Sequence, residues 1–105
     1  MKKGYYITAD GKKVDIITNI FPSVYLPSKN INHIVLPDKI QFLSCRDNNL
    51  NELIIPEGTK EVFCANNNLT NIIIPDSVTY ISADIKAIDL IKYKHAKTEI
   101  RIHLP

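Results

Sequence analysis

The chain has 105 residues, of which 45% are hydrophobic, so we expect one folded domain with a single core rather than a disordered chain. A formal net charge of +2 is smaller than the basic balance expected of a dedicated nucleic-acid-binding protein. The N-terminal residues contain no apolar signal-peptide core, and no apolar run is long enough to cross a membrane, so we expect a cytoplasmic protein.

Residues 5–18, YYITADGKKVDIIT, alternate apolar and polar side chains on both sides of Asp10-Gly11. An Asp-Gly pair suits a tight turn between two antiparallel strands. We therefore predict a β-hairpin within residues 1–22. Because a terminal turn of a repeat protein exposes its core, we expect this hairpin to cap the N-terminal end of the repeats that follow.

Residues 23–90 repeat with a period of 19 residues. Three copies begin at Val24, Leu43 and Val62, and a degraded fourth copy, ISADIKAIDL, begins at Ile81. Four columns of the three copies are apolar, and a proline column follows them: Leu26, Cys45 and Cys64; Ile31, Leu50 and Leu69; Ile34, Leu53 and Ile72; Leu36, Ile55 and Ile74; and Pro37, Pro56 and Pro75. The shared register indicates stacked copies of one structural unit.

The short period limits what each copy can contain. A coil of this length has to leave one strand and return to the next rung, about 4.8 Å away. About a dozen residues remain for the return, too few for a crossover that includes a helix. Proline in the return favours extended or polyproline-like backbone. We predict a solenoid of about four rungs with a parallel sheet.

The pattern Leu-x-Leu-x-x-Asn-x-Leu is matched by Leu43, Cys45, Asn48 and Leu50, and again by Val62, Cys64, Asn67 and Leu69. It resembles the leucine-rich repeat family, in particular its short bacterial or phage-type repeats with a cysteine and asparagine ladder. IPDSVTYI, residues 74–81, also resembles a repeat variant of bacterial surface proteins. The resemblance implies an α/β-class, mostly β solenoid whose function is to bind other proteins. Lys29 departs from the pattern, so we expect the asparagine ladder to start one rung later.

Asn48 and Asn67 stand where the chain turns off the strand. A buried asparagine there can bond neighbouring backbone groups with both its donor and its acceptor. Stacked rungs would make the two residues a ladder. The alternative, two turn asparagines on the surface, fits the shared register less well.

Residues 91–105 are expected to form a C-terminal cap. Residues 97–104, KTEIRIHL, alternate and predict a half-buried strand, whereas residues 87–94, AIDLIKYK, suit a short helix or an irregular segment. A free strand edge at this end would allow pairing with a second copy, although lysine and arginine discourage it. We expect a monomer or a weak homodimer formed through a sheet edge.

The chain offers few groups for catalysis. Cys45 and Cys64 should lie on adjacent rungs, where a disulfide, a redox pair or half of a metal site are the reactive alternatives. No CxxC motif or second cysteine pair exists, so packing of both thiols as small hydrophobic groups is favoured. The three histidines lack partners at metal-ligand spacing, and three glycines provide no phosphate-binding loop. We expect a non-enzyme without a metal or cofactor.

Residues next to the inward strand positions should point to the opposite, concave face of the sheet. Exposed aromatic rings beside an arginine are typical of protein-binding hot spots. We predict a partner-binding face made of Tyr25, Phe42, Ser44, Arg46, Glu61, Phe63, Tyr80 and Ser82. Alternatively, a cap or loop covers some of the rings, or Phe42 and Tyr80 turn partly into the core.

These observations favour a non-catalytic module for protein–protein interaction. A sharper version is an inhibitor, such as a phage or mobile-element product that blocks a host defence protein, for example an anti-CRISPR. The alternative is nucleic-acid binding through a basic C-terminal face made of Lys92, Lys94, His95, Lys97, Arg101 and His103. Acidic residues interrupt this run and no aromatic residues alternate with it, so nucleic acid is the less favoured partner.

Overall fold

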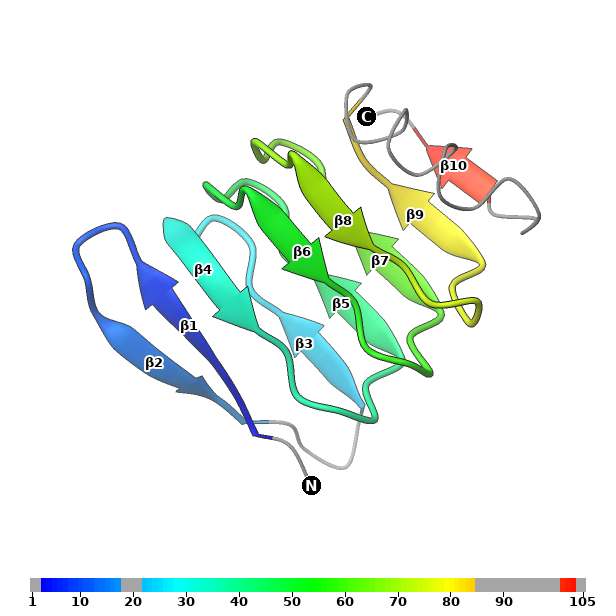
Figure 1. The fold of residues 1–105 in the computed structure, drawn as a ribbon, viewed down its shortest axis with the longest axis horizontal. Helices are drawn as coiled ribbons and strands as arrows, with labels where there is room; N and C mark the ends of the chain where they lie inside the picture. The colour runs from blue at the N-terminus through cyan, green and yellow to red at the C-terminus, as the bar shows by residue number, and fades with distance from the viewer. Residues whose placement is uncertain (1–2, 18–21, 85–100, 104–105) are drawn as a thin grey trace.

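The computed structural model describes residues 3–17, 22–84 and 101–103. These residues form ten short strands and no helix, and hence no helix that could span a membrane (Figure 1). The strands are β1 (Gly4–Thr8), β2 (Lys13–Ile16), β3 (Ser23–Tyr25), β4 (Ile31–Val35), β5 (Phe42–Ser44), β6 (Glu52–Ile54), β7 (Glu61–Phe63), β8 (Asn71–Ile73), β9 (Tyr80–Ser82) and β10 (Arg101–His103). The described part is therefore all-β rather than α/β.

The repeats wind into a solenoid of three turns. Each turn contributes two strands, one to each of two layers, and β9 begins a fourth turn. In the rear layer of Figure 1, β3, β5, β7 and β9 pair in parallel. Their register aligns Val24, Leu43, Val62 and Ile81, which are spaced by the repeat period. The prediction of a solenoid with a parallel sheet is confirmed.

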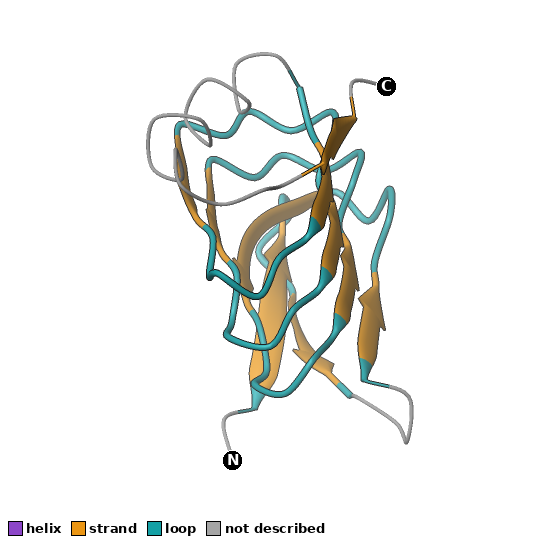
Figure 2. Cartoon of the chain, turned by 90° about the vertical axis from the view of Figure 1, so that its right-hand side faces the viewer, coloured by secondary structure: helices purple, strands orange, loops and turns teal. Residues whose placement is uncertain are grey.

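The return segments form a second layer of strands. β6 and β8 pair in parallel, and β4 lies beside β6 in the front layer of Figure 1. The sequence predicted extended backbone here but not this second parallel sheet. Figure 2 shows the two layers of strands joined by loops.

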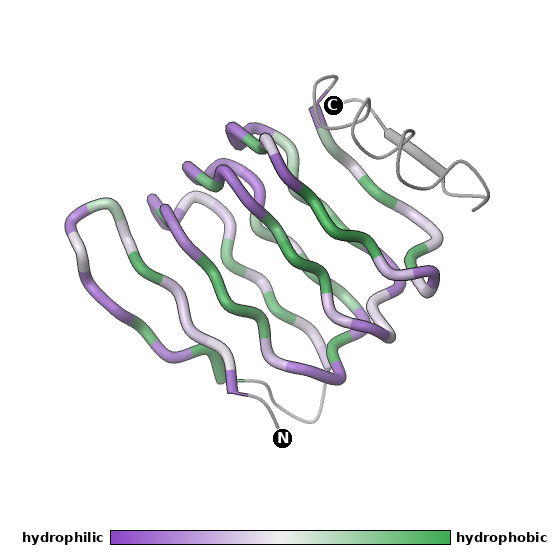
Figure 3. Tube along the Cα trace, viewed as in Figure 1, coloured by the Kyte–Doolittle hydropathy of each residue, from purple (hydrophilic) through white to green (hydrophobic). Residues whose placement is uncertain are grey.

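The core fills the space between the layers. Val24, Leu43, Val62 and Ile81 enter it from the rear sheet, and Leu53 and Ile72 from the front one, all at most 3% exposed. Figure 3 shows apolar residues recurring at the same place in successive turns. Complete burial of each aliphatic side chain stabilises by roughly 1.5–3 kcal/mol, so stacking the turns provides most of the stabilisation.

Asn48 is buried and its side chain bonds only to backbone. Its Oδ1 accepts hydrogen bonds from the backbone N–H groups of Lys29 and Ile31, both at 3.0 Å. Its Nδ2 donates to the carbonyl oxygens of Leu26 and Cys45, both at 2.9 Å, and to that of Arg46 at 3.1 Å. One side chain thus links two successive turns, as the sequence predicted.

Asn67 repeats this arrangement one turn later. Its Oδ1 accepts from Leu50 N–H at 3.0 Å, and its Nδ2 donates to the carbonyls of Cys45 and Cys64 at 3.1 Å. The Asp84 carboxylate then accepts from the N–H groups of Asn66 and Asn67, at 3.0 and 3.2 Å. The asparagine ladder is confirmed, and a carboxylate continues it where the repeat degrades.

The N-terminal hairpin is present, with β1 and β2 antiparallel. Gly11 has φ of 88°, a conformation in which glycine carries no steric cost. β1 also pairs antiparallel with β4, giving the sheet order β2-β1-β4, so the hairpin extends the front layer. Tyr6 and Ile16 pack against the core.

At the other end, β10 pairs in parallel with β9 and aligns Ile102 with Ile81. The strand predicted within residues 97–104 is thus present at Arg101–His103. The helix or irregular segment predicted at 87–94, the end of the repeat region at 85–90 and nearly all of the predicted C-terminal cap lie outside the described residues.

Candidate functional site

The outer face of the rear sheet presents two side-chain columns. The register aligns Ser23, Phe42, Glu61 and Tyr80 in the first column and Tyr25, Ser44, Phe63 and Ser82 in the second. From β3 to β9, each strand carries one aromatic ring, and the ring changes column at every step. The result is a checkerboard of bulky and smaller side chains.

The Phe63 ring contacts two other rings of the checkerboard, those of Phe42 and Tyr80. The ring centroids of Phe42 and Phe63 are 5.4 Å apart with the planes tilted by 43°, and those of Phe63 and Tyr80 are 5.4 Å apart at 44°. These separations are in the favourable range for aromatic pairs, which contribute roughly 0.5–1.5 kcal/mol each beyond burial. Three of the four aromatic residues of the predicted face therefore form a row of contacting side chains, each of them half-buried.

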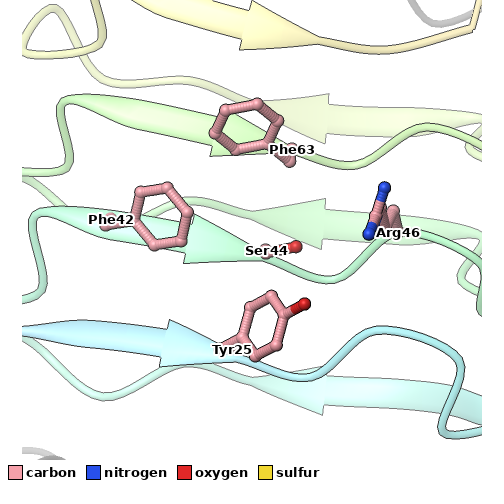
Figure 4. Close-up of a pocket in the computed structure, with 5 residues that line it drawn as sticks. All are labelled: Tyr25, Phe42, Ser44, Arg46 and Phe63. Atoms are coloured by element: carbon pink, nitrogen blue, oxygen red, sulfur yellow. The ribbon is translucent and has the colours of Figure 1, made fainter. Parts of the chain in front are cut away.

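Tyr25 lies on the same face and is 63% exposed. With Phe42, Ser44, Arg46 and Phe63 it lines an open pocket of about 240 Å³ (Figure 4). Ser44 is 3% exposed and stands between Tyr25 and Phe63 in the second column, so it forms the floor. Figure 4 shows the three rings around it and Arg46 beyond the end of the strand.

Seven of the eight residues of the predicted face lie at outward register positions and Arg46 lies two residues beyond the end of β5, but their exposure differs. Tyr25, Arg46 and Glu61 are exposed, Phe42, Phe63 and Tyr80 are half-buried, and Ser44 and Ser82 are buried. Ser44 is buried because it stands between Tyr25 and Phe63, and Ser82 stands beside Phe63. Phe42 and Tyr80 contact Phe63 on the outer face, which argues against their turning into the core. The concave curvature of this face remains a prediction.

Arg46 lies two residues beyond the end of β5 and forms no ion pair with another described residue. Its backbone is fixed, because its carbonyl accepts from Ser28 N–H at 3.1 Å and from the Asn48 side chain. Glu61, at the start of β7, likewise forms no ion pair within the described ranges. Among the eight residues of the predicted face, Arg46 is the one cation and Glu61 the one anion, and neither charge is paired within the described part of the chain.

Cys45 and Cys64 lie on the inner side of the same sheet and are free, fully buried thiols. Burial raises the pKa of Cys45 to about 12. Burial, with smaller contributions from Cys45 and Asp84, also raises the pKa of Cys64 well above its usual value. Protonated thiols are poor nucleophiles and poor metal ligands, so both cysteines act as small hydrophobic core groups, as expected.

Metal-ligating side chains do not gather in this part of the chain: among the described residues, no group of three or more His, Cys, Asp or Glu could hold an ion. His33 is exposed, and the centroid of its ring lies 6.1 Å from that of Tyr5. Of the six residues of the basic C-terminal face predicted as an alternative site, Arg101 and His103 lie in β10, and the other four fall outside the described residues.

Sequence reasoning did not identify an apolar pair on the opposite face. Ile54 and Ile73 are neighbours in the register of β6 and β8 and are 51% and 46% exposed. Side chains alternate between the two faces along a strand, so the inward positions of Leu53 and Ile72 would have indicated that Ile54 and Ile73 point outward. They provide matched positions for control substitutions.

Comparison with known proteins gives no relative for this chain: no family model, curated protein or solved structure matches it. The family resemblance therefore stays a prediction. The function has to be argued from the outer face of the rear sheet itself.

Proposed function

We propose that the protein is a non-catalytic interaction module that binds a partner protein with the outer face of β3, β5, β7 and β9. The observation that carries this proposal is the row of contacting rings Phe42, Phe63 and Tyr80, which ends beside the exposed Tyr25. Aromatic residues and arginine dominate the binding energy of protein interfaces. A central ring is expected to contribute about 2 kcal/mol or more.

The rigidity of this face supports the same role. Each strand is held by a parallel ladder on the sheet, and the turn after each strand is tied by an asparagine or by Asp84. The rings also restrict one another. A partner therefore has little conformational entropy to remove on binding, which favours affinity over a mobile surface of equal area.

We further propose that the solenoid is a short leucine-rich repeat protein whose hairpin β1–β2 serves as the N-terminal cap. Support comes from the pairing of β1 with β4 and from the packing of Tyr6 and Ile16 on the core. Residues 91–105 are proposed to cap the other end, where β10 continues the rear sheet.

An inhibitory role is the sharper form of the proposal. A rigid face without reactive groups acts by occupying its partner's surface, and a phage or mobile-element protein that blocks a host defence protein would act in this way. We propose that this happens in the cytoplasm, since two free thiols in the core fit a reducing compartment.

Affinity capture from the native host with matched variants tests this function. The wild type is expected to retain a partner that the double variant Tyr25→Ala/Phe63→Ala loses, whereas Ile54→Ala/Ile73→Ala retains it. The control pair removes comparable exposed apolar groups from the other face. Equal capture by all three proteins, each shown to be folded by circular dichroism, would reject the aromatic face as the binding surface.

A further inference from the structure

The pocket on the outer face is small, and its size limits what can occupy it. Its volume of about 240 Å³ lies below the roughly 300–1,000 Å³ of sites for cofactors and drug-sized ligands. Three of its five lining residues are aromatic. The pocket exists because Ser44 occupies a position flanked by Tyr25 and Phe63. It has room for one bulky apolar side chain of a partner.

The two charges of the face lie on opposite sides of the rings. Glu61 is aligned with Phe42 at the start of the strands, and Arg46 follows Phe42 by four residues. At about 3.3 Å per residue, they are roughly 13 Å apart along the strand direction. A complementary segment thus needs an acidic group at one end, a basic group at the other and an apolar side chain between them.

The chemistry of Arg46 favours a carboxylate as its partner. A guanidinium binds a carboxylate through two parallel hydrogen bonds. A nucleic-acid backbone would need several cations, and this pocket has one. Backbone donors beside the pocket are already used, since Leu26 N–H donates to Ser44 O at 2.8 Å and Cys45 N–H to Phe63 O at 2.9 Å. No cluster of free N–H groups is therefore present around the pocket to capture a chain terminus, and a side-chain carboxylate fits best.

We propose that the partner inserts an apolar, preferably aromatic, side chain above Ser44 and pairs an acidic side chain of the same segment with Arg46 and a basic one with Glu61. This inference rests on the proposed function and specifies the partner's chemistry. In an extended segment, residues at positions 1, 3 and 5 share one face and span about 13 Å. The pattern basic-x-aromatic-x-acidic meets the requirement.

The probe is the peptide acetyl-Lys-Thr-Phe-Thr-Glu-amide, titrated into isotope-labelled protein and followed by amide chemical shifts. Shifts are expected at Ser44, Arg46 and Phe63. The peptide with Gln in place of Glu is expected to bind roughly fivefold more weakly, the upper range for an exposed ion pair. The Arg46→Gln protein should bind the Glu peptide as weakly as the wild type binds the Gln peptide. Replacing Glu by Gln in the peptide should not weaken binding to Arg46→Gln any further. A peptide of equal composition, acetyl-Thr-Lys-Phe-Glu-Thr-amide, turns both charges away from Phe and serves as the control.

Three results would overturn the proposal: no shift at these amides with millimolar peptide, equal binding of the Glu and Gln peptides, or tighter binding of an oligothymidylate at the same amides. These results differ from failure of the proposed function. Capture of a protein can still depend on Tyr25 and Phe63 while the Glu and Gln peptides do not distinguish the wild type from Arg46→Gln. In that case the face binds a partner, but the occupant of the pocket has another chemistry. If the peptides couple to Arg46, the pocket assignment stands whatever the capture yields.

Discussion

Replacing Asn48 by Ala is expected to destabilise the solenoid by about 4 kcal/mol. The side chain makes five hydrogen bonds to backbone groups on two turns. Ile31 N–H belongs to a residue with no exposed surface, so water cannot replace the partner that it loses, whereas the Cys45 carbonyl keeps its bond from the Asn67 side chain. The buried Ile31 N–H without this partner costs roughly 2 kcal/mol, and loss of the part-buried bonds to Lys29 N–H and Leu26 C=O adds about 1 kcal/mol each, which gives the expected value.

The comparison is made with Asn49→Ala, one residue away. Asn49 is exposed, and its Nδ2 donates to Asn30 Oδ1 at 2.6 Å. Loss of such a surface contact usually changes stability by less than about 0.5 kcal/mol. Urea denaturation followed by circular dichroism measures both variants, with an unchanged m value confirming that the same surface is exposed on unfolding.

A loss of this size is a large part of the roughly 5–15 kcal/mol expected for a domain. It corresponds to a fall in melting temperature of roughly 15–30 °C, at about 4–8 °C per kcal/mol for a chain of this length. If Asn48→Ala and Asn49→Ala unfold at the same urea concentration, the ladder does not hold the turns together, and the reasoning fails.

Three further substitutions test other parts of the structure. Gly4→Ala places a Cβ 2.5 Å from Pro37 Cδ and 2.7 Å from its backbone N, so the hairpin should shift and stability should fall by more than about 1 kcal/mol in thermal unfolding. The thiols of Cys45 and Cys64 are protonated when folded and titrate near pH 9.0 when unfolded, so stability is retained below that pH and lost above it. The loss is expected to be about 1.4 kcal/mol per thiol and pH unit up to the folded pKa, measured as urea midpoints from pH 8 to pH 10.5. Ser44→Leu should fill the pocket and remove binding of the probe peptide without removing any ring, as measured by the same amide titration.

Each of these expectations has a control. Lys3→Ala, at an exposed neighbouring position, should leave the melting temperature unchanged, and equal stability of Gly4→Ala would refute the close approach. The variant Cys45→Ala/Cys64→Ala should lose the alkaline slope, and a slope equal to that of the wild type would assign it to other groups. Ser82→Leu enlarges the other buried serine of the face, outside the pocket, and should leave the probe peptide bound.

The repeat period made much of the solenoid predictable from sequence. Once copies are aligned, Cys45 and Cys64 must fall on the same side of adjacent strands, and Asn48 and Asn67 at the same turn. The prediction of the ladder and of the outward rings follows from this alignment alone. It succeeds because in-register parallel strands convert a sequence offset directly into a spatial neighbour.

Other features depend on contacts that the pattern does not contain. β6 and β8 have three residues each, too few for alternation to distinguish a paired strand from extended backbone. The hairpin was predictable because its turn and strands are local in the sequence. Its pairing with β4 was not, because the hairpin could pair with the edge of either sheet and the contact joins distant parts of the chain. Ser44 was expected to be exposed. Its burial depends on the size of Tyr25 and Phe63 on the adjacent strands, which no single strand reveals.

The alternating placement of rings constrains how such a protein can lengthen by internal duplication. Copying one turn, for example that of β5, would set two identical phenylalanines directly opposite each other and two serines side by side, leaving a trough instead of a pocket. Copying two adjacent turns keeps the alternation and creates a second pocket of the same kind. Longer descendants that preserve the binding surface should therefore gain rungs in even numbers.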